Sequence, residues 1–413
     1  MGLIKLSRDV KIEQKEMLPN RIYSVAVISS VPPDPNLIAG ALILSRWLDH
    51  PQIDWTYIEP SVKPPNLLGR VINRLTNSRV HRIAYPIKCF YEGNAVANYL
   101  RLKAFFRQCL REVTEMQPQI ILSIAHGPYY KIAYRVSKLT GVPLVLLAQD
   151  WWPAFEDVKP AHKKKEEQEF ISICSKSAAT IAVSEGMFKE LGSPANTSVV
   201  HDIPSAVRLN TTETAVSTSL PLKVIYAGNL ATYGPMVEQA ALACMDSDLV
   251  KLDIFGREPI WWSEGMRTRF EEAGVYRGFV SPTDFAKVAE EYDFVLAIMS
   301  FAPELRQRMR TCFLSKIIEL AQLGKPIVVW GPEDGSAAVW ARKTGAALCV
   351  TEESPAALRE ALERLANDVE EQDRLVRAIQ ASAANEFNPV KIRQEFMEIL
   401  EQVSNKSVMQ TGS

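Results

Sequence analysis

Three polar residues near position 315 have the types and spacing to bind an anionic ligand. Ser315, Lys316 and Glu319 lie in the segment FLSKIIELAQLGKPIVVWG at 313–331, which predicts a short helix followed by an apolar strand. Residues three and four positions apart share a helical face, so the three side chains can meet one ligand. The start of the helix favours an anion, because its N–H groups and dipole point outward there. The carboxylate of Glu319 can accept two hydrogen bonds from a diol such as ribose.

The same pattern also fits an ordinary amphipathic helix whose Lys–Glu pair is solvated. Upstream of it, Arg306, Arg308 and Arg310 are placed to neutralise a phosphate. Their alternate spacing prevents all three from pointing the same way. We select Arg310, the nearest to the helix, as the phosphate candidate.

Further candidates follow directly after predicted strands, where open parallel sheets bind their ligands. His126 follows QIILSIA at 119–125, and Asp150, with Trp151 and Trp152 beside it, follows PLVLLA at 143–148. A histidine there can orient a sugar hydroxyl or a leaving group, and a carboxylate beside indole rings suits a carbohydrate. Each also fits a structural role, His126 bonded to backbone and Asp150 capping a turn. We name both as catalytic candidates.

The turn after LKVIYAG at 222–228 is a candidate for contact with a diphosphate. Gly228 and Asn229 end that strand, and a glycine lets the backbone approach a ligand closely. The turn after the first strand, IYSVAVISS at 22–30, contains no G-x-G-x-x-G. The sequence therefore excludes a standard dinucleotide fingerprint.

Short apolar runs alternate with helical patterns along the chain, which predicts parallel sheets covered on both faces. The polar stretch AVRLNTTETAVSTSL divides this series in two. We predict an α/β protein with two doubly wound domains facing each other across a cleft. The expected parts are an N-terminal domain (1–204), a linker (205–221), a C-terminal domain (222–387), an amphipathic helix (388–403) and a polar tail (404–413).

Composition limits the class of protein. The chain has 413 residues and a formal charge of −1, which argues against a dedicated nucleic-acid binder. Its six cysteines show no metal-ligand spacing and read as reduced thiols. No apolar run is long enough to span a bilayer and the N-terminus is charged, so we expect a cytoplasmic protein. The segment 61–88 is basic, which indicates an anionic or membrane-borne partner or, alternatively, a solvated surface.

The chain resembles glycosyltransferases of the GT-B fold, and is most similar to glycosyltransferase family 4. The resemblance rests on the two-domain layout, His126, and the segments VSEGMFKEL (183–191), YAGNL (226–230) and SKIIELAQLGKP (315–326). It implies two Rossmann-like domains and transfer of a sugar from a nucleotide-sugar donor to a glycan, lipid-linked or small-molecule acceptor. It also implies retention of anomeric configuration, no required metal and no cofactor.

The resemblance assigns roles to four of the candidate residues. It implies that Glu319 holds the donor ribose, that Ser315 and Lys316 lie near the diphosphate, and that His126 lies near the donor sugar. It also implies that the final helix crosses back onto the N-terminal domain.

Three positions depart from the family pattern. Thr311 stands where a first glutamate is common, Asn229 and Tyr233 stand where an Arg and a Lys usually bind diphosphate, and only Gly40 represents the glycine-rich loop of the N-terminal domain. A non-catalytic binding or scaffold protein that kept the fold is therefore the alternative. A nucleotide-sugar 2-epimerase would show a richer set of carboxylates and histidines.

Overall fold

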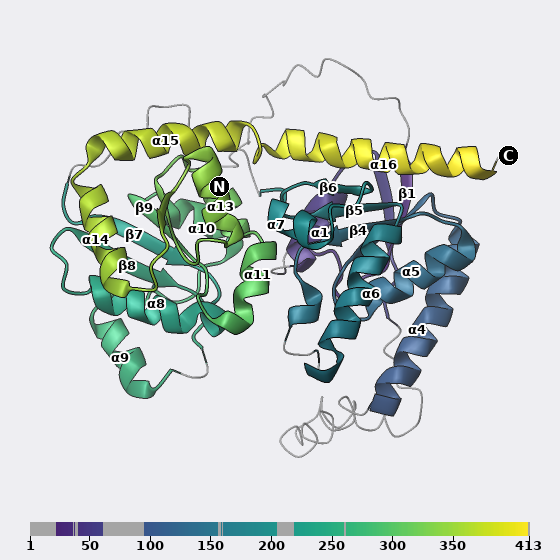
Figure 1. Cartoon of the computed structure of the whole chain (residues 1–413), viewed down its shortest axis with the longest axis horizontal. Coiled ribbons are helices and arrows are strands. Elements are labelled where there is room, and N and C mark those ends of the chain that lie inside the picture. Colours follow the sequence, from purple (N-terminus) through teal and green to yellow (C-terminus); the bar gives the residue numbers. More distant parts are fainter. Residues whose placement is uncertain are drawn as a thin grey trace, which may run out of the picture.

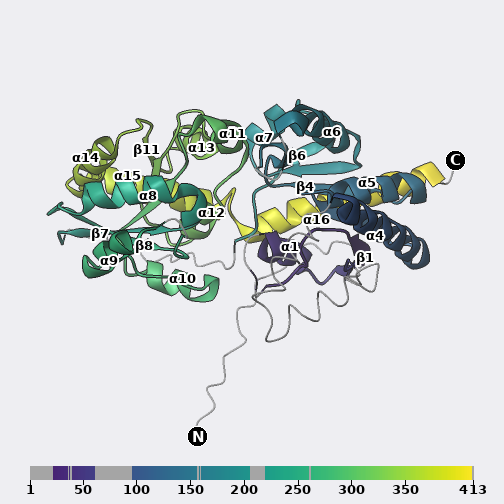
Figure 2. The ribbon, with the colours of Figure 1, turned by 90° about the horizontal axis from the view of Figure 1, so that it is seen from below.

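The structure is a computed structural model. It describes residues 22–35, 37, 40–60, 95–155, 158, 160–204, 219–259 and 262–411. The segments form two lobes that lie side by side, with the long helix α16 running along one of them (Figures 1 and 2).

The N-terminal domain is built on a parallel sheet with strand order β2-β1-β3-β4-β5-β6. Its central strands β3 and β4 are wholly buried, as near-continuous apolar sequence in a parallel sheet requires. The elements are β1 (Tyr23–Val27), α1 (Gly40–Leu48), β2 (Ile53–Tyr57), α4 (Ala95–Met116), β3 (Ile120–Ile124), α5 (Tyr129–Thr140), β4 (Leu144–Ala148), η1 (Trp152–Ala154), η2 (Pro160–His162), α6 (Lys163–Lys176), β5 (Ala179–Ala182), α7 (Glu185–Glu190) and β6 (Thr197–Val199).

The C-terminal domain repeats this plan with the strand order β11-β10-β9-β7-β8, again all parallel. Its elements are β7 (Leu222–Ala227), α8 (Leu230–Cys244), β8 (Val250–Phe255), α9 (Glu264–Glu272), α10 (Pro282–Ala289), β9 (Phe294–Ile298), η3 (Pro303–Leu305), α11 (Arg306–Thr311), α12 (Ser315–Ala321), β10 (Ile327–Trp330), α13 (Ser336–Thr344), β11 (Leu348–Val350), α14 (Pro355–Ala366), α15 (Val369–Ala384) and α16 (Pro389–Thr411).

Both sheets change winding direction at their first strand. β1 lies between β2 and β3, and β7 lies between β8 and β9. The chain order reverses there, and ligands of open α/β sheets bind outside the carboxyl ends of the strands at such points. The prediction of two doubly wound α/β domains is confirmed.

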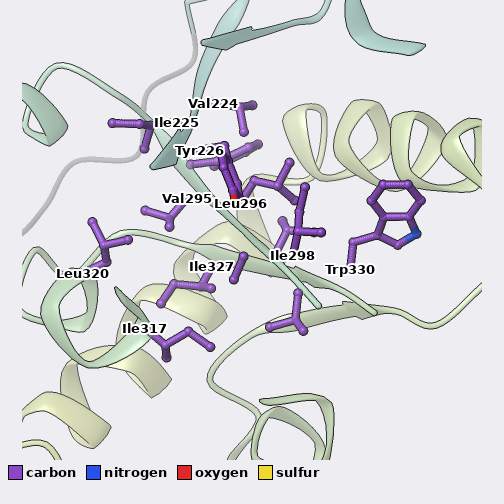
Figure 3. Packing of buried hydrophobic residues seen from close by; sticks show 14 of the residues in the cluster. Val224, Ile225, Tyr226, Val295, Leu296, Ile298, Ile317, Leu320, Ile327 and Trp330 are labelled. Atoms are coloured by element: carbon purple, nitrogen blue, oxygen red, sulfur yellow. The ribbon is translucent and has the colours of Figure 1, made fainter. Parts of the chain in front are cut away.

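Helix α12 is fixed by the core of the C-terminal domain. Ile317 and Leu320 are buried, and they pack in the same cluster as Tyr226, Ile298 and Trp330 of the sheet (Figure 3). Gly324, with φ +64°, ends the turn after the helix and leads into β10. The apolar face of α12 therefore packs against the sheet.

Helix α16 packs on the N-terminal domain although it follows the C-terminal one (Figure 1). Phe396 meets Trp47 of α1 edge to face, with ring centroids 4.8 Å apart, and Ile392 and Val403 are buried in the same cluster. The helix continues to Thr411, beyond the expected end at 403 and through most of the expected polar tail, because no Gly or Pro interrupts residues 404–411.

Some expectations from the sequence concern residues that the structure does not describe. The basic segment 61–88 and the linker residues 205–218 lie outside the described residues. Cys89 does too, while the five other cysteines are free thiols and four of them are buried. None of the described helices is long and apolar enough to cross a bilayer.

Candidate functional site

The two domains meet through helix α11 and the turn between β5 and α7. The Ser184 hydroxyl donates to the carbonyl oxygen of Thr311 at 2.6 Å, and the Gln307 side chain donates to Glu167 at 2.8 Å. Ser184 directly follows the strand β5 region, and Thr311 ends α11, which follows β9. The candidate residues after the strands of both sheets are therefore brought to one boundary.

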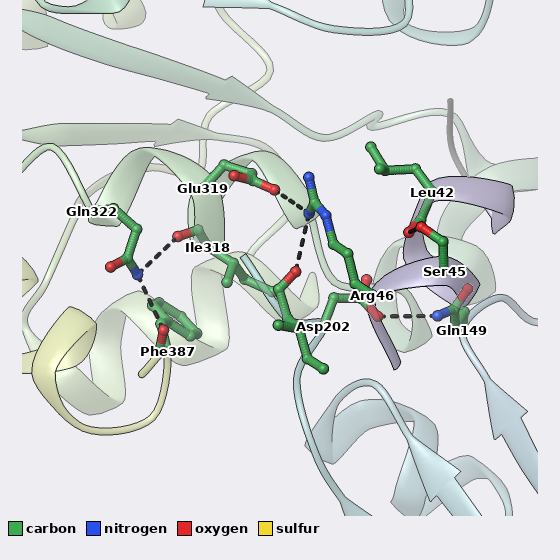
Figure 4. Close-up of polar contacts among 10 residues, drawn as sticks. Leu42, Ser45, Arg46, Gln149, Asp202, Ile318, Glu319, Gln322 and Phe387 are labelled. Carbon is green, nitrogen blue, oxygen red and sulfur yellow. Dashed lines mark hydrogen bonds and ion pairs between the residues drawn. The ribbon is translucent and has the colours of Figure 1, made fainter. Parts of the chain in front are cut away.

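An ion pair between Arg46 and Glu319 crosses this boundary (Figure 4). Arg46 lies in the last turn of α1, and its Nη1 also donates to the carbonyl oxygen of Ile203 at 3.0 Å. The two side chains are only 16% and 18% exposed. Glu319, the predicted ribose ligand, thus pairs with an arginine of the other domain.

Lys316 lies one turn before Glu319 on the same side of α12. Its ammonium group is 4.2 Å from the centroid of the Phe285 ring, within range of a cation–π contact. Burial lowers the pKa of Lys316, and the Glu319 carboxylate opposes that shift while Arg46 adds to it. Lys316, Glu319 and Arg46 therefore form one charged group, which we call the α12 cluster.

Asp202, which follows β6, is a buried carboxyl group next to the α12 cluster. It accepts a hydrogen bond from the Gln149 side chain at 3.0 Å (Figure 4). Burial raises the pKa of Asp202 to about 7, against the opposing effect of Arg46. The gap beside it, lined partly by Trp47, Gln149 and Asp202, is too narrow to hold a water molecule. That is smaller than a typical ligand pocket, so it is no place for a nucleotide sugar.

The raised pKa of Asp202 predicts a pH-dependent stability. Between about pH 4 and pH 7 the folded chain keeps a proton that the unfolded chain releases, so the free energy of unfolding falls as pH rises through this window. We expect Asp202→Asn, which imitates the protonated acid, to raise the melting temperature above pH 7 and to flatten this slope. Thermal unfolding from pH 4 to pH 8 measures it, with the exposed Asp49→Asn as the control. Parallel curves for Asp202→Asn and the unaltered protein would contradict the expectation.

A second group, which we call the aromatic cluster, surrounds Asp150. The His126 ring lies 4.5 Å from Trp152 and 5.2 Å from Phe155, measured between centroids. Arg308 of α11 stands with its guanidinium 4.4 Å from the centroid of Phe155 and its Nε 3.7 Å from Asp150 Oδ1. Four of these residues come from the N-terminal domain, and Arg308 comes from the C-terminal domain.

The aromatic cluster has the chemistry of a carbohydrate site. Aromatic faces suit the C–H surface of a sugar ring, while the carboxylate and guanidinium offer an acceptor and donors to its hydroxyls. Trp151 does not take part, because it is buried against Phe170 and its indole N–H donates to Glu167 at 3.1 Å. Within the described residues, no three His, Cys, Asp or Glu side chains gather as metal ligands.

The remaining predicted residues have other surroundings. Arg310 pairs with Glu190 of α7 at 3.6 Å and so contributes to the contact between domains. A Cβ on Gly228 would lie 2.8 Å from the Tyr226 hydroxyl, so a larger residue there would crowd that side chain. Asn229 is exposed, and Ser315 is the first residue of α12.

Sequence reasoning did not select Arg308, Arg46 or Asp202. Arg308 was visible as one of three arginines, but the spacing alone did not distinguish it from Arg310. Arg46 and Asp202 stand in no recognisable motif. Only the tertiary structure brings them to Glu319 and Gln149 (Figure 4).

Comparison with known proteins identifies the fold. No protein-family model matches the chain, and no curated protein sequence does. Among solved structures, HepE of Anabaena in complex with UDP-glucose matches with a TM-score of 0.59 at 14% identity, over 92% of this chain and 99% of that one. The chain has the GT-B fold. Two further solved structures agree. Sucrose-phosphate synthase of Thermosynechococcus elongatus matches with a TM-score of 0.64 at 11% identity, over 92% of this chain and 99% of that one. A glycosyltransferase of Rickettsia africae matches with a TM-score of 0.60 at 12% identity, over 93% of this chain and 99% of that one.

The GT-B expectation is therefore confirmed along nearly the whole chain. At identities this low, the structural match shows the fold alone, and membership of glycosyltransferase family 4 stays a prediction. In the GT-B fold, the α12 cluster and the aromatic cluster both lie where the two Rossmann-like domains meet.

Proposed function

We propose that this protein is a glycosyltransferase. It moves a sugar from a nucleotide-sugar donor to a glycan, lipid-linked or small-molecule acceptor. The observation that carries the proposal is the ion pair of Glu319 with Arg46 of the other domain, with Lys316 one helical turn away, at the boundary of a GT-B fold. HepE, which shares this fold along 92% of the chain, was solved with UDP-glucose bound.

In this proposal the two clusters bind different parts of the substrates. Glu319 and Lys316 take the ribose and the diphosphate of the donor, and Asp150 with His126 orients the sugar and its acceptor. Positioning and stabilisation of the leaving diphosphate supply the catalysis. The proposal includes retention of configuration, no metal requirement, a cytoplasmic location and contact of 61–88 with an anionic or membrane-borne acceptor.

A release assay tests the proposal directly. Nucleoside diphosphate is measured from a panel of nucleotide sugars, each with and without glycan and lipid acceptors. We expect one donor to release its diphosphate, faster when the right acceptor is present. No release and no donor binding by calorimetry across the panel would favour the non-catalytic scaffold instead.

Glu319→Ala separates the binding role from a structural one. We expect donor affinity to fall about tenfold or more, because a charged acceptor for two ribose hydroxyls is lost. The loss of the ion pair with Arg46 lowers the melting temperature by only a few degrees. Calorimetry and thermal unfolding measure the two effects, and Glu371→Ala, which breaks an ion pair with Arg374 within α15, is the matched control. Unchanged donor affinity in a folded variant would reject the ribose role.

A further inference from the structure

Arg46 brings a positive charge from the N-terminal domain to the polar face of α12. Its contacts with Ile203 and Glu319 are both made by Nη1 (Figure 4). A guanidinium carries five N–H donors on three nitrogens, so Nη2 and Nε keep donors for a further acceptor. Because the side chain is only 16% exposed, a bond to an anion there is weakly screened by water.

The α12 cluster holds two cations and one carboxylate, Glu319, which contacts Arg46. Burial lowers the pKa of Lys316 and the nearby charge of Arg46 lowers it further, and no ion pair to Lys316 occurs within the described residues. Glu319 alone offsets this repulsion at short range. An additional anion placed between the two cations would relieve it, as a diphosphate would.

The C-terminal domain itself offers little positive charge to a diphosphate. The turn after β7 presents the exposed Asn229, and Tyr233 on α8 is buried. The arginines of α11 are engaged with carboxylates, Arg306 with Asp334, Arg308 with Asp150 and Arg310 with Glu190. Lys316 and Arg46 are thus the cations of the α12 face that are available to a donor.

We propose that Arg46 binds the diphosphate of the donor, and that Glu319 exchanges Arg46 for the donor ribose. This inference rests on the proposed function. In the structure the two residues form an ion pair across the domain boundary. When the donor enters, the carboxylate takes the ribose hydroxyls and the guanidinium takes the phosphate oxygens, so neither charge is left buried without a partner.

Paired binding measurements test the exchange. Calorimetry compares uridine with UDP, adenosine with ADP and guanosine with GDP, and the pair that binds is then followed in Arg46→Gln. We expect the diphosphate to bind about tenfold more weakly in the variant, because a charge-assisted contact is lost. The nucleoside should bind as well as before or more tightly, because Arg46 no longer competes for Glu319. Arg46→Lys should give an intermediate affinity for the diphosphate.

Other outcomes overturn the inference in distinguishable ways. If Arg46→Gln bound both the nucleoside and the diphosphate more tightly, Arg46 would only block the site. If the variant bound both ligands equally more weakly, or both with unchanged affinity, the role of Arg46 would be structural. Arg393→Gln, which removes an arginine of α16 paired with Asp49, is the control for altered charge near α1. Failure of the unaltered protein to bind any nucleoside or diphosphate would overturn the proposed function with it.

Discussion

Asp150→Asn should reduce sugar transfer about a hundredfold or more while the protein stays folded. Asp150 is the carboxylate of the aromatic cluster, and it faces Arg308 across the domain boundary with a side chain 37% exposed. Hydrogen bonds from sugar hydroxyls to a charged group contribute about 1.5–3 kcal/mol each, so losing two of them removes a large factor from kcat/KM. The amide keeps the size of the side chain, which limits structural effects.

The measurement is kcat/KM for diphosphate release with the donor that the panel identifies. Asp334→Asn is a close control, because Asp334 also pairs with an arginine of α11, Arg306, at 2.6 Å, but within the C-terminal domain. We expect that control to retain its rate. An Asp150→Asn variant with nearly full transfer would show that the aromatic cluster is not the sugar site.

Most of the strands that the sequence revealed are largely buried on both faces, although the equally buried Ala179–Ala182 was not among them. Ile120–Ile124 and Leu144–Ala148 are continuous apolar runs, and burial between two helical layers produces that pattern. The edge strand Ile53–Tyr57 exposes three of its five residues and carries Asp and Thr, so it lacks the pattern. Local sequence therefore predicts the centre of each sheet better than its edges.

In the candidate site, too, residues close together in the sequence were predictable as neighbours, and residues far apart in the sequence were not. Lys316 and Glu319 were predictable because one helical turn relates them. The partner of Glu319, Arg46, is 273 positions away and belongs to the other domain. No spacing rule links such residues, and their contact depends on how the two sheets face each other.

Arg308 and Arg310 show where periodicity stops being informative. Two residues on a helix that are two positions apart point in widely different directions, so only one was expected at a ligand. Both meet the N-terminal domain, Arg310 at Glu190 and Arg308 at Asp150. Which of them faces the aromatic cluster is decided by the docking of α11, which the sequence does not state.

That docking depends on a close approach between Gly186 of α7 and the backbone of α11. A Cβ at Gly186 would lie 1.8 Å from the carbonyl oxygen of Arg310, far inside van der Waals contact. The neighbouring Ser184 caps α7 by accepting from the Met187 N–H and also donates to Thr311. The absence of a side chain at Gly186 is what lets these two helices meet.

Gly186→Ala should therefore separate the domains and abolish most transfer. The obstructing atom is backbone, so α7 and α11 must move apart by more than about 1 Å, and the hydrogen bond from Ser184 to Thr311 breaks. Arg308 then leaves the aromatic cluster, and a misplacement of this size costs about a hundredfold in rate. Each domain keeps its own buried core, so both should stay folded.

Small-angle X-ray scattering measures the separation of the domains, calorimetry measures their unfolding, and the activity assay measures the transfer rate. We expect a larger radius of gyration, two separate unfolding transitions and a transfer rate near background. Gly265→Ala is the matched control, because a Cβ there in α9 meets no atom within 4 Å and alanine favours a helix. It should leave scattering and rate unchanged and slightly raise the melting temperature. If Gly186→Ala scattered and reacted like the unaltered protein, the contact between α7 and α11 could not be what places Arg308 against Asp150.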